Sequence, residues 1–307
     1  LRRMHRKIAV IDARIAFVGG INIIDDMHTQ PQIPPRFDYM VRVEGPLLAQ
    51  IYPVVLRLWH MLMWIQLRRR MPESHALVAH AEPCGQQRAV FLVRDNVRHR
   101  RDIEQAYLHG IEAARREIII ACAYFFPGIS FRRALSEAAA RGVRVVLLLQ
   151  GRVEYMLLHY ATRALYGSLL SAGVEIHEYH RSFLHAKVAV IDSCWSTVGS
   201  SNIDPFSLAL AREANVVVYD AGFGQQLRAS LMEALEAGAK VVSPSRWMHQ
   251  PLWKRVPIWI GLMPPTYWNQ KGSEIRVIIW ALCTQAAVAT ERAKTGRAKR
   301  STGSMGA

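Results

Sequence analysis

Short apolar runs separated by turn residues mark the start of the chain. Residues 8–11 (IAVI) and 15–18 (IAFV) predict two strands that are joined at residues 12–14. Residues 25–37 carry three prolines among polar residues and predict a loop, and residues 39–43 predict a third strand. These strands are short enough to belong to a compact sheet.

A long apolar segment follows at residues 47–67, and its pattern predicts a helix. Its second half is rich in Leu, Met and Trp, and three arginines (residues 68–70) come directly after it. Two interpretations stay open. The segment is either a core helix with cations at its C-terminal end, or an interfacial helix with Trp at headgroup depth and Arg on lipid phosphate.

Strands and helices alternate from residue 89 onward. The pattern predicts strands at residues 89–93, 118–124, 143–149, 174–179 and 215–219, and helices at 102–117, 130–142, 154–172 and 223–237. This alternation is typical of an α/β domain in which helices cover both faces of a sheet.

The pattern divides the chain into four parts. Residues 1–70 predict the C-terminal part of a first lobe, residues 71–88 a polar linker, residues 89–245 a complete second lobe, and residues 246–307 a Trp-rich basic tail. We expect this tail to be membrane-interfacial or disordered. The first lobe has fewer elements than the second, and the chain opens on Leu1, so we expect a truncated start.

An internal repeat relates the two lobes. His5, Lys7 and Asp12 recur as His185, Lys187 and Asp192, each 180 residues later in the pattern His-x-Lys-x4-Asp. At this offset, 10 of the 19 positions from 5 to 23 are identical to those from 185 to 203. Two copies at so long a period predict a pair of similar lobes that face each other.

The net charge indicates the chemical class of the binding partner, and the cysteine spacing argues against disulfide and zinc sites. With 39 Lys and Arg against 24 Asp and Glu, the net charge is +15, which favours a polyanionic partner, either nucleic acid or an anionic membrane. The four cysteines, at positions 84, 122, 194 and 283, are widely spaced, so neither a disulfide framework nor a zinc site is indicated, and a reducing, cytosolic environment fits. No run of 18 apolar residues predicts a membrane span.

The repeat carries the chemistry that a phosphate ester needs. Residues two apart on a strand share a face, so His185 projects with Lys187, and His5 projects with Lys7. One neutral imidazole can attack phosphorus, the other can donate and then accept a proton, and the lysines can stabilise charge on the phosphoryl oxygens. The six repeated residues are therefore the candidate catalytic residues, although Asp12 and Asp192 have the opposite parity and lie at the turn.

Other polar residues near the repeat complete the predicted site. Asn22, Asn202 and Ser200 can donate to the phosphate. Asp38 and Glu213 each precede an apolar strand, and either carboxylate can hold a histidine ring by accepting its N–H. The sequence leaves open which histidine each of them holds. We expect neither a metal nor another cofactor.

At these residues the chain resembles the phospholipase D superfamily, whose signature is the duplicated His-x-Lys-x4-Asp. The segments GGIN (residues 19–22) and GSSN (199–202) match the segments that follow the motif in that superfamily. The resemblance covers residues 1–240. It implies two pseudo-twofold-related α/β/α sandwich lobes, the first incomplete here, with a phosphohistidine intermediate at the interface between them. It also implies that His5 is the nucleophile and that the motif Asp is structural.

Within the superfamily, residues 1–7 (LRRMHRK), 17–22 (FVGGIN) and 200–207 (SSNIDPFS) resemble the bacterial cardiolipin synthases. The resemblance implies phosphatidyl transfer that makes cardiolipin from phosphatidylglycerol, on anionic phospholipids at the cytoplasmic face of the bacterial membrane.

Two alternatives to phosphatidyl transfer stay open. One is a phospholipase D-type hydrolase or a nuclease of the same superfamily, in which water replaces the alcohol. The other is a non-catalytic, basic nucleic-acid-binding module. The intact histidines in both copies argue against the binding module, so nucleic acid is the less favoured partner. The sequence does not indicate the oligomeric state.

Overall fold

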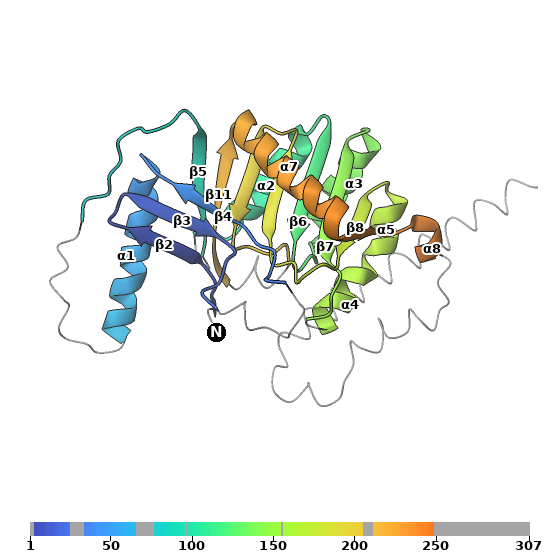
Figure 1. Ribbon diagram of the computed structural model, residues 1–307, viewed down its shortest axis with the longest axis horizontal. Helices are drawn as coiled ribbons and strands as arrows, with labels where there is room; N and C mark the ends of the chain where they lie inside the picture. Colours follow the sequence, from blue (N-terminus) through green and yellow to red (C-terminus); the bar gives the residue numbers. More distant parts are fainter. Residues whose placement is uncertain are drawn as a thin grey trace, which may run out of the picture. The chain divides into compact units, whose positions relative to one another are not determined.

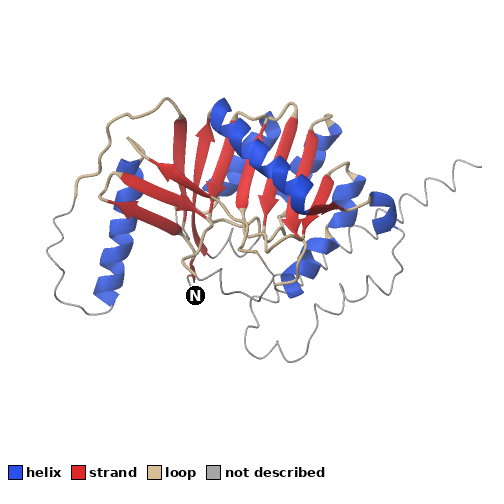
Figure 2. Cartoon of the chain, viewed as in Figure 1, coloured by secondary structure: helices blue, strands red, loops and turns tan. Residues whose placement is uncertain are grey.

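A large mixed sheet and a small antiparallel sheet form the framework of the protein (Figures 1 and 2). The computed structural model describes residues 3–24, 34–65, 77–95, 98–154, 156–204 and 211–248. They belong to one compact unit, Leu1–Gln250. Most of the predicted tail, from residue 249 onward, and the first part of the predicted linker, within residues 66–76, lie outside the described residues.

The small sheet is built from the first copy of the repeat. Its strands are β2 (Lys7–Ile11), β3 (Ile15–Gly19) and β4 (Met40–Val43), in that order. The two strands of the predicted hairpin pair in antiparallel register, with Lys7 opposite Gly19. Helix α1 (Leu48–Ile65) covers this sheet, with Leu48 and Ile51 buried against Ala16 and Val18. The three predicted strands and the start of the predicted helix are thus confirmed to within about one residue. Most of the loop predicted at residues 25–37, and the predicted end of the helix at residues 66–67, lie outside the described residues.

The large sheet carries the second copy. Its strands run in the order β1-β11-β10-β9-β6-β7-β8-β12, and β5 pairs with β11. Their bounds are β1 Arg3–Met4, β5 Arg88–Arg94, β6 Glu117–Cys122, β7 Arg144–Gln150, β8 Glu175–Tyr179, β9 Lys187–Ile191, β10 Trp195–Gly199, β11 Ala211–Tyr219 and β12 Ala239–Val241.

Helices cover both faces of the large sheet, as the alternating pattern predicts (Figure 1). On one face α7 (Ala221–Gly238) buries Leu227 and Leu231 against Ile119, Val146 and Val188. Helices α2 (Asp102–Ala113) and α3 (Ile129–Ala140) pack together on the other face. The small sheet packs against β11 and β5, so that Val18 and Val216 share one apolar cluster.

Two predictions about the second lobe are corrected by the structure. The single helix expected at residues 154–172 is two helices, α4 (Met156–Ala164) and α5 (Tyr166–Ser171), separated at Leu165. A short helix, α8 (Pro244–Met248), follows β12. Trp247, which the sequence groups with the tail, is buried on α8. Its ring packs at a tilt against the ring of Tyr166, with the centroids 5.0 Å apart, because a buried aromatic pair is more stable than an exposed indole. No helix of the described residues is apolar for long enough to cross a membrane.

Candidate active site

The two copies of the repeat form equivalent hairpins. In both, the turn has two consecutive residues with positive φ: Asp12 and Ala13 in the first hairpin, and Asp192 and Ser193 in the second. Each histidine lies two residues before the first lysine of its strand, β2 or β9. The fold brings the two histidine ends together although they are 180 residues apart in sequence.

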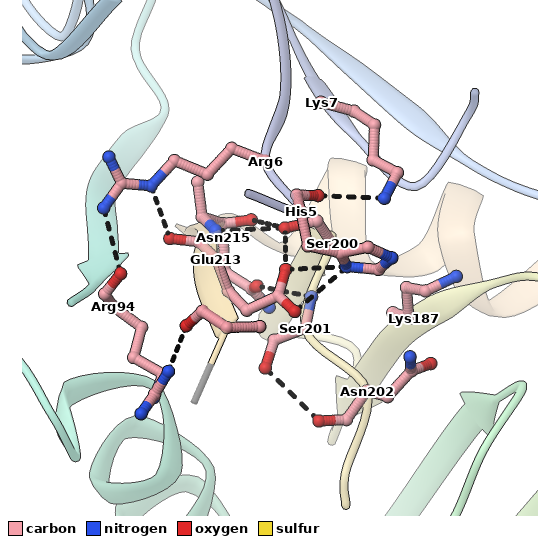
Figure 3. Close-up of polar contacts among 12 residues, drawn as sticks. His5, Arg6, Lys7, Arg94, Lys187, Ser200, Ser201, Asn202, Glu213 and Asn215 are labelled. Carbon is pink, nitrogen blue, oxygen red and sulfur yellow. Dashed lines mark hydrogen bonds and ion pairs between the residues drawn. The ribbon is translucent and has the colours of Figure 1, made fainter. Parts of the chain in front are cut away.

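His5 reaches the site because β1 pairs in parallel with β11, with Met4 opposite Arg212. The His5 backbone N–H donates to the Arg212 carbonyl at 3.1 Å, which aligns the ring with the next residue, Glu213. His5 Nδ1 lies 3.0 Å from both carboxylate oxygens of Glu213, a residue with no exposed surface (Figure 3). A buried carboxylate at this distance holds the ring with Nε2 directed away from it.

Ser200 fixes the carboxylate of Glu213. Its hydroxyl donates to Glu213 Oε2 at 2.6 Å and accepts the backbone N–H of Ala214 at 3.0 Å. The sequence predicts that Ser200 binds the phosphate. In the structure its proton is engaged with Glu213, so the serine orients the histidine's partner instead of facing a ligand with a free donor.

His185 has the corresponding arrangement with Asp38. Residues 37 and 184 form a parallel bridge, in which Phe37 N–H donates to the Phe183 carbonyl and His185 N–H donates to the Phe37 carbonyl, both at 2.9 Å. His185 Nδ1 is 2.6 Å from Asp38 Oδ2, and both side chains are nearly buried. A Cβ added at Gly20 would lie 2.3 Å from Asp38 Oδ1, so only glycine fits where the other copy has Ser200.

The carboxylates are exchanged between the two copies. Glu213 follows the second hairpin but holds His5 of the first, and Asp38 follows the first hairpin but holds His185 of the second. Each half of the site is therefore incomplete without the other lobe. The sequence indicates both carboxylates as partners of the histidines but leaves this exchange open.

The two lysines concentrate positive charge at the same place. Lys7 Nζ donates to the His5 carbonyl at 2.9 Å, and Lys187 Nζ donates to the His185 carbonyl. Burial and then the nearby charge of Lys187 lower the pKa of Lys7 to about 8. Burial also lowers the pKa of Lys187. In Figure 3 the ammonium groups and the His5 ring point toward one another, as a phosphate between them requires.

His185 is biased toward its neutral form. Burial lowers its pKa most strongly, and Lys187 and Lys7 add to the effect, whereas Asp38 opposes it. An anionic phosphate beside the two lysines would offset their positive charge and so raise the pKa of His185. The protonation of His185 is thus coupled to the binding of an anionic ligand.

Comparisons with known proteins place these features in a family. Residues 107–235 match the family model described as "Cardiolipin synthase, PLD-like domain". The resemblance to the phospholipase D superfamily is confirmed. Cardiolipin synthase B of Escherichia coli K12 is 42% identical over 252 residues, which are 82% of this chain and 60% of that protein. Cardiolipin synthase A of Pectobacterium atrosepticum is 30% identical over 257 residues, 83% of this chain and 52% of that protein.

A solved structure shares the fold. Phosphatidylserine synthase of Haemophilus influenzae Rd KW20 matches with a TM-score of 0.64 at 13% identity, over 90% of this chain and 69% of that chain. The predicted fold, an α/β phospholipase D fold, is confirmed. The chain spans 60% of the length of the cardiolipin synthase B relatives and 52% of that cardiolipin synthase A.

The aspartates of the two motifs lie away from the histidines. Asp192 is five residues beyond Lys187 on β9, or about 16 Å along an extended strand. Its carboxylate accepts the backbone N–H groups of Arg115, Arg116 and Glu117, each at 2.8 Å, and so joins the hairpin turn to the start of β6. Asp12 is exposed at the equivalent turn. The structure brings neither aspartate to the catalytic groups.

The two predicted asparagines differ in their surroundings. Asn202 is buried, and its Oδ1 has no hydrogen-bond partner within the part of the chain that the structure describes. Figure 3 shows it beside Lys187, where its side-chain amide can meet a ligand. Asn22, just after β3, is half-buried. Phosphate binding by both asparagines stays a prediction.

Sequence reasoning missed three buried or half-buried polar residues on or beside β11, the strand that carries Glu213. Arg6 donates to the carbonyls of Glu213 and Arg94, and the fully buried Arg94 donates to the Ala211 carbonyl. Asn215 Nδ2 donates to Thr197 Oγ1 at 3.1 Å. For Asn215 the sequence does hold a signal. It directly precedes three valines (residues 216–218) in a predicted buried strand, and a buried polar side chain needs a hydrogen-bond partner.

Proposed function

We propose that the protein transfers a phosphatidyl group between phospholipids and makes cardiolipin from phosphatidylglycerol. The observation that carries the proposal is the pair of histidines, each held at Nδ1 by a buried carboxylate and each accompanied by a lysine. The similarity to the cardiolipin synthases supports the choice of substrate. Nothing in this arrangement calls for a cofactor.

The first half of the reaction makes a covalent intermediate. Nε2 of His5, the nucleophile implied by the superfamily resemblance, attacks the phosphorus of phosphatidylglycerol. The bond from phosphorus to the headgroup oxygen breaks, and protonated His185 gives its proton to that oxygen, so glycerol leaves. Lys7 and Lys187 stabilise the charge that develops on the phosphoryl oxygens.

The second half transfers the group to a second lipid. Neutral His185 takes the proton from the terminal hydroxyl of another phosphatidylglycerol, whose oxygen attacks the phosphohistidine. The P–N bond to His5 breaks, and cardiolipin leaves. Glu213 and Asp38 keep both rings in one tautomer throughout, as the aspartate of a catalytic triad does.

We infer that the partner is an anionic phospholipid surface, on which the protein is peripheral. The net charge of +15 and the lipid headgroups that the reaction needs support this partner. The widely spaced cysteines support the reducing side of the bacterial membrane, its cytoplasmic face.

Radiolabelled phosphatidylglycerol in mixed detergent micelles tests the function of the full chain. We expect labelled cardiolipin and an equal amount of glycerol. Phosphatidic acid as the sole product would replace the proposal with a hydrolase. Cleavage of DNA without any lipid turnover would replace it with a nuclease.

A further inference from the structure

The C-terminal half of α1 exposes several large apolar side chains, although Met63 within it is buried. The N-terminal half of this helix packs on the small sheet through Leu48 and Ile51. In the last two turns, by contrast, Trp59 is 52% exposed, Leu62 42% and Trp64 80%. Figure 1 shows this end of α1 extending past the strands of the small sheet. The core interpretation of the helix is thus confirmed for its N-terminal half, and the interfacial interpretation of the C-terminal half stays a prediction.

Exposure of two tryptophans, Trp59 and Trp64, on neighbouring turns of one helix is unusual. Isolated exposed aliphatic residues are ordinary, and Ile129 on α3 and Val241 on β12 are examples here. Indole side chains concentrate where an apolar environment meets a wet one, above all at the headgroup level of membranes. The other tryptophans of the described residues, Trp195 and Trp247, are buried.

Three arginines lie beside this end of α1. Arg57 is exposed on the helix, and Arg212 Nη1 lies 3.9 Å from the sulfur of Met61. Burial and then the charge of Arg212 lower the pKa of Arg6, and Arg57 adds a smaller effect, whereas the carboxylates of Asp95 and Glu213 oppose it. Such mutual repulsion is relieved when an anion binds.

No carboxylate pairs with these arginines among the residues that the structure describes. Arg6 donates to the carbonyls of Glu213 and Arg94, and Arg57 donates to the Pro53 carbonyl of its own helix. Their charge is therefore available to phosphate groups. These side chains project from different sides of the helix, with Trp64 about 140° around from Trp59. We name the exposed C-terminal end of α1, which carries Arg57, Trp59, Leu62 and Trp64 and has Arg212 beside it, the α1 docking face.

The α1 docking face adjoins the catalytic centre. The same Arg212 that touches Met61 accepts the backbone N–H of His5 through its carbonyl at 3.1 Å. We propose that the α1 docking face binds the surface of an anionic phospholipid membrane and thereby delivers lipid headgroups to His5. The identity of the delivered lipid rests on the proposed function. The new part of the inference is the surface of the protein that contacts the membrane.

Vesicle binding by the full chain tests the docking face. We would measure cosedimentation with vesicles of phosphatidylglycerol and phosphatidylcholine, and with vesicles of phosphatidylcholine alone. The double variant Trp59→Ser/Trp64→Ser is expected to lose roughly tenfold in affinity for the anionic vesicles, since both indoles leave the interface. Arg57→Glu is expected to weaken binding to anionic vesicles alone, by roughly tenfold at low salt.

Ile129→Ser is the matched control, because it removes an apolar side chain that is 69% exposed on α3. Its vesicle binding should equal that of the wild type, and thermal unfolding should show that all variants are folded. Turnover on vesicles should fall roughly tenfold further in the tryptophan variant than turnover of monomeric short-chain phosphatidylglycerol.

Three results would overturn the inference: unchanged vesicle binding by both α1 variants, an equal loss in Ile129→Ser, or a lipid-free dimer of the wild type that the tryptophan variant abolishes. The proposed function fails separately. Wild-type protein that binds through α1 but makes no cardiolipin would contradict the reaction alone, whereas cardiolipin synthesis with normal binding by the variants would contradict the docking face alone.

Discussion

At the scale of single residues, the site depends on carboxylates that come from the opposite copy of the repeat. The pairs His5–Glu213 and His185–Asp38 join residues 208 and 147 positions apart. The sequence predicts the residue types, because a nucleophilic imidazole needs an acceptor at its second nitrogen. The pairing itself depends on how β1 and the segment before β4 lie against the second lobe, which no local pattern encodes.

Glu213→Gln and Asp38→Asn test this exchange. Each variant keeps the shape of the side chain but removes the charge that fixes the imidazole tautomer, so we expect kcat to fall by about 10²–10⁴-fold. Steady-state cardiolipin synthesis measures the effect. Glu82→Gln, at a side chain that is 85% exposed, is the control and should retain wild-type kcat. Near-normal kcat in either site variant would remove that carboxylate from the mechanism.

The pH dependence of the reaction should report on Lys7. Its ammonium group is charged below a pKa of about 8 and neutral above it. Because only the charged form stabilises the phosphoryl oxygens, we expect kcat/KM to fall as the pH rises through about 8. A guanidinium stays charged at this pH, so Lys7→Arg should move the alkaline limb to higher pH. An unmoved limb would assign the titration to another group.

At the scale of the elements, the hairpins are the part that the sequence predicts best. Residues 8–11 and 187–191 are apolar runs bounded by turn residues, and both are strands in the structure. Prediction was poorer at the C-terminal end of the second lobe. The division between α4 and α5 and the burial of Trp247 both depend on α8 packing against α5, which is a tertiary contact between short segments.

The two hairpin turns allow a matched test of the motif aspartate. Burial alone would raise the pKa of Asp192, but the N–H groups of Glu117, Arg115 and Arg116 lower it overall. The ionised Asp192 carboxylate therefore stabilises the fold at any pH above about 3.9, the pKa of an aspartate in an unfolded chain. This stabilisation is lost as the pH falls through the lower pKa that Asp192 has in the folded protein.

Asp192→Asn should lower the free energy of unfolding by about 1–3 kcal/mol at neutral pH, because an amide places its NH₂ group against backbone donors. Urea denaturation measures the change. Asp12→Asn, at the exposed equivalent turn, should alter it by less than about 0.5 kcal/mol. Equal effects of the two substitutions would contradict a structural role that is specific to Asp192.

At the scale of the whole molecule, the small sheet and the large sheet converge on one catalytic centre. The duplicated motif predicts two related hairpins and the superfamily fold. It does not predict that the histidine ends of both hairpins and the carboxylates of both lobes meet in one site. The account as a whole therefore depends on His5 forming a bond to phosphorus.

Trapping that bond is the most direct measurement. The full chain would be mixed with phosphatidylglycerol that is ³²P-labelled, quenched in base after milliseconds, and digested for mass spectrometry. We predict base-stable, acid-labile label on His5 that disappears in His5→Ala and is released as cardiolipin when unlabelled phosphatidylglycerol is added before the quench. Cardiolipin synthesis without any labelled histidine, or with undiminished label in His5→Ala, would contradict the account.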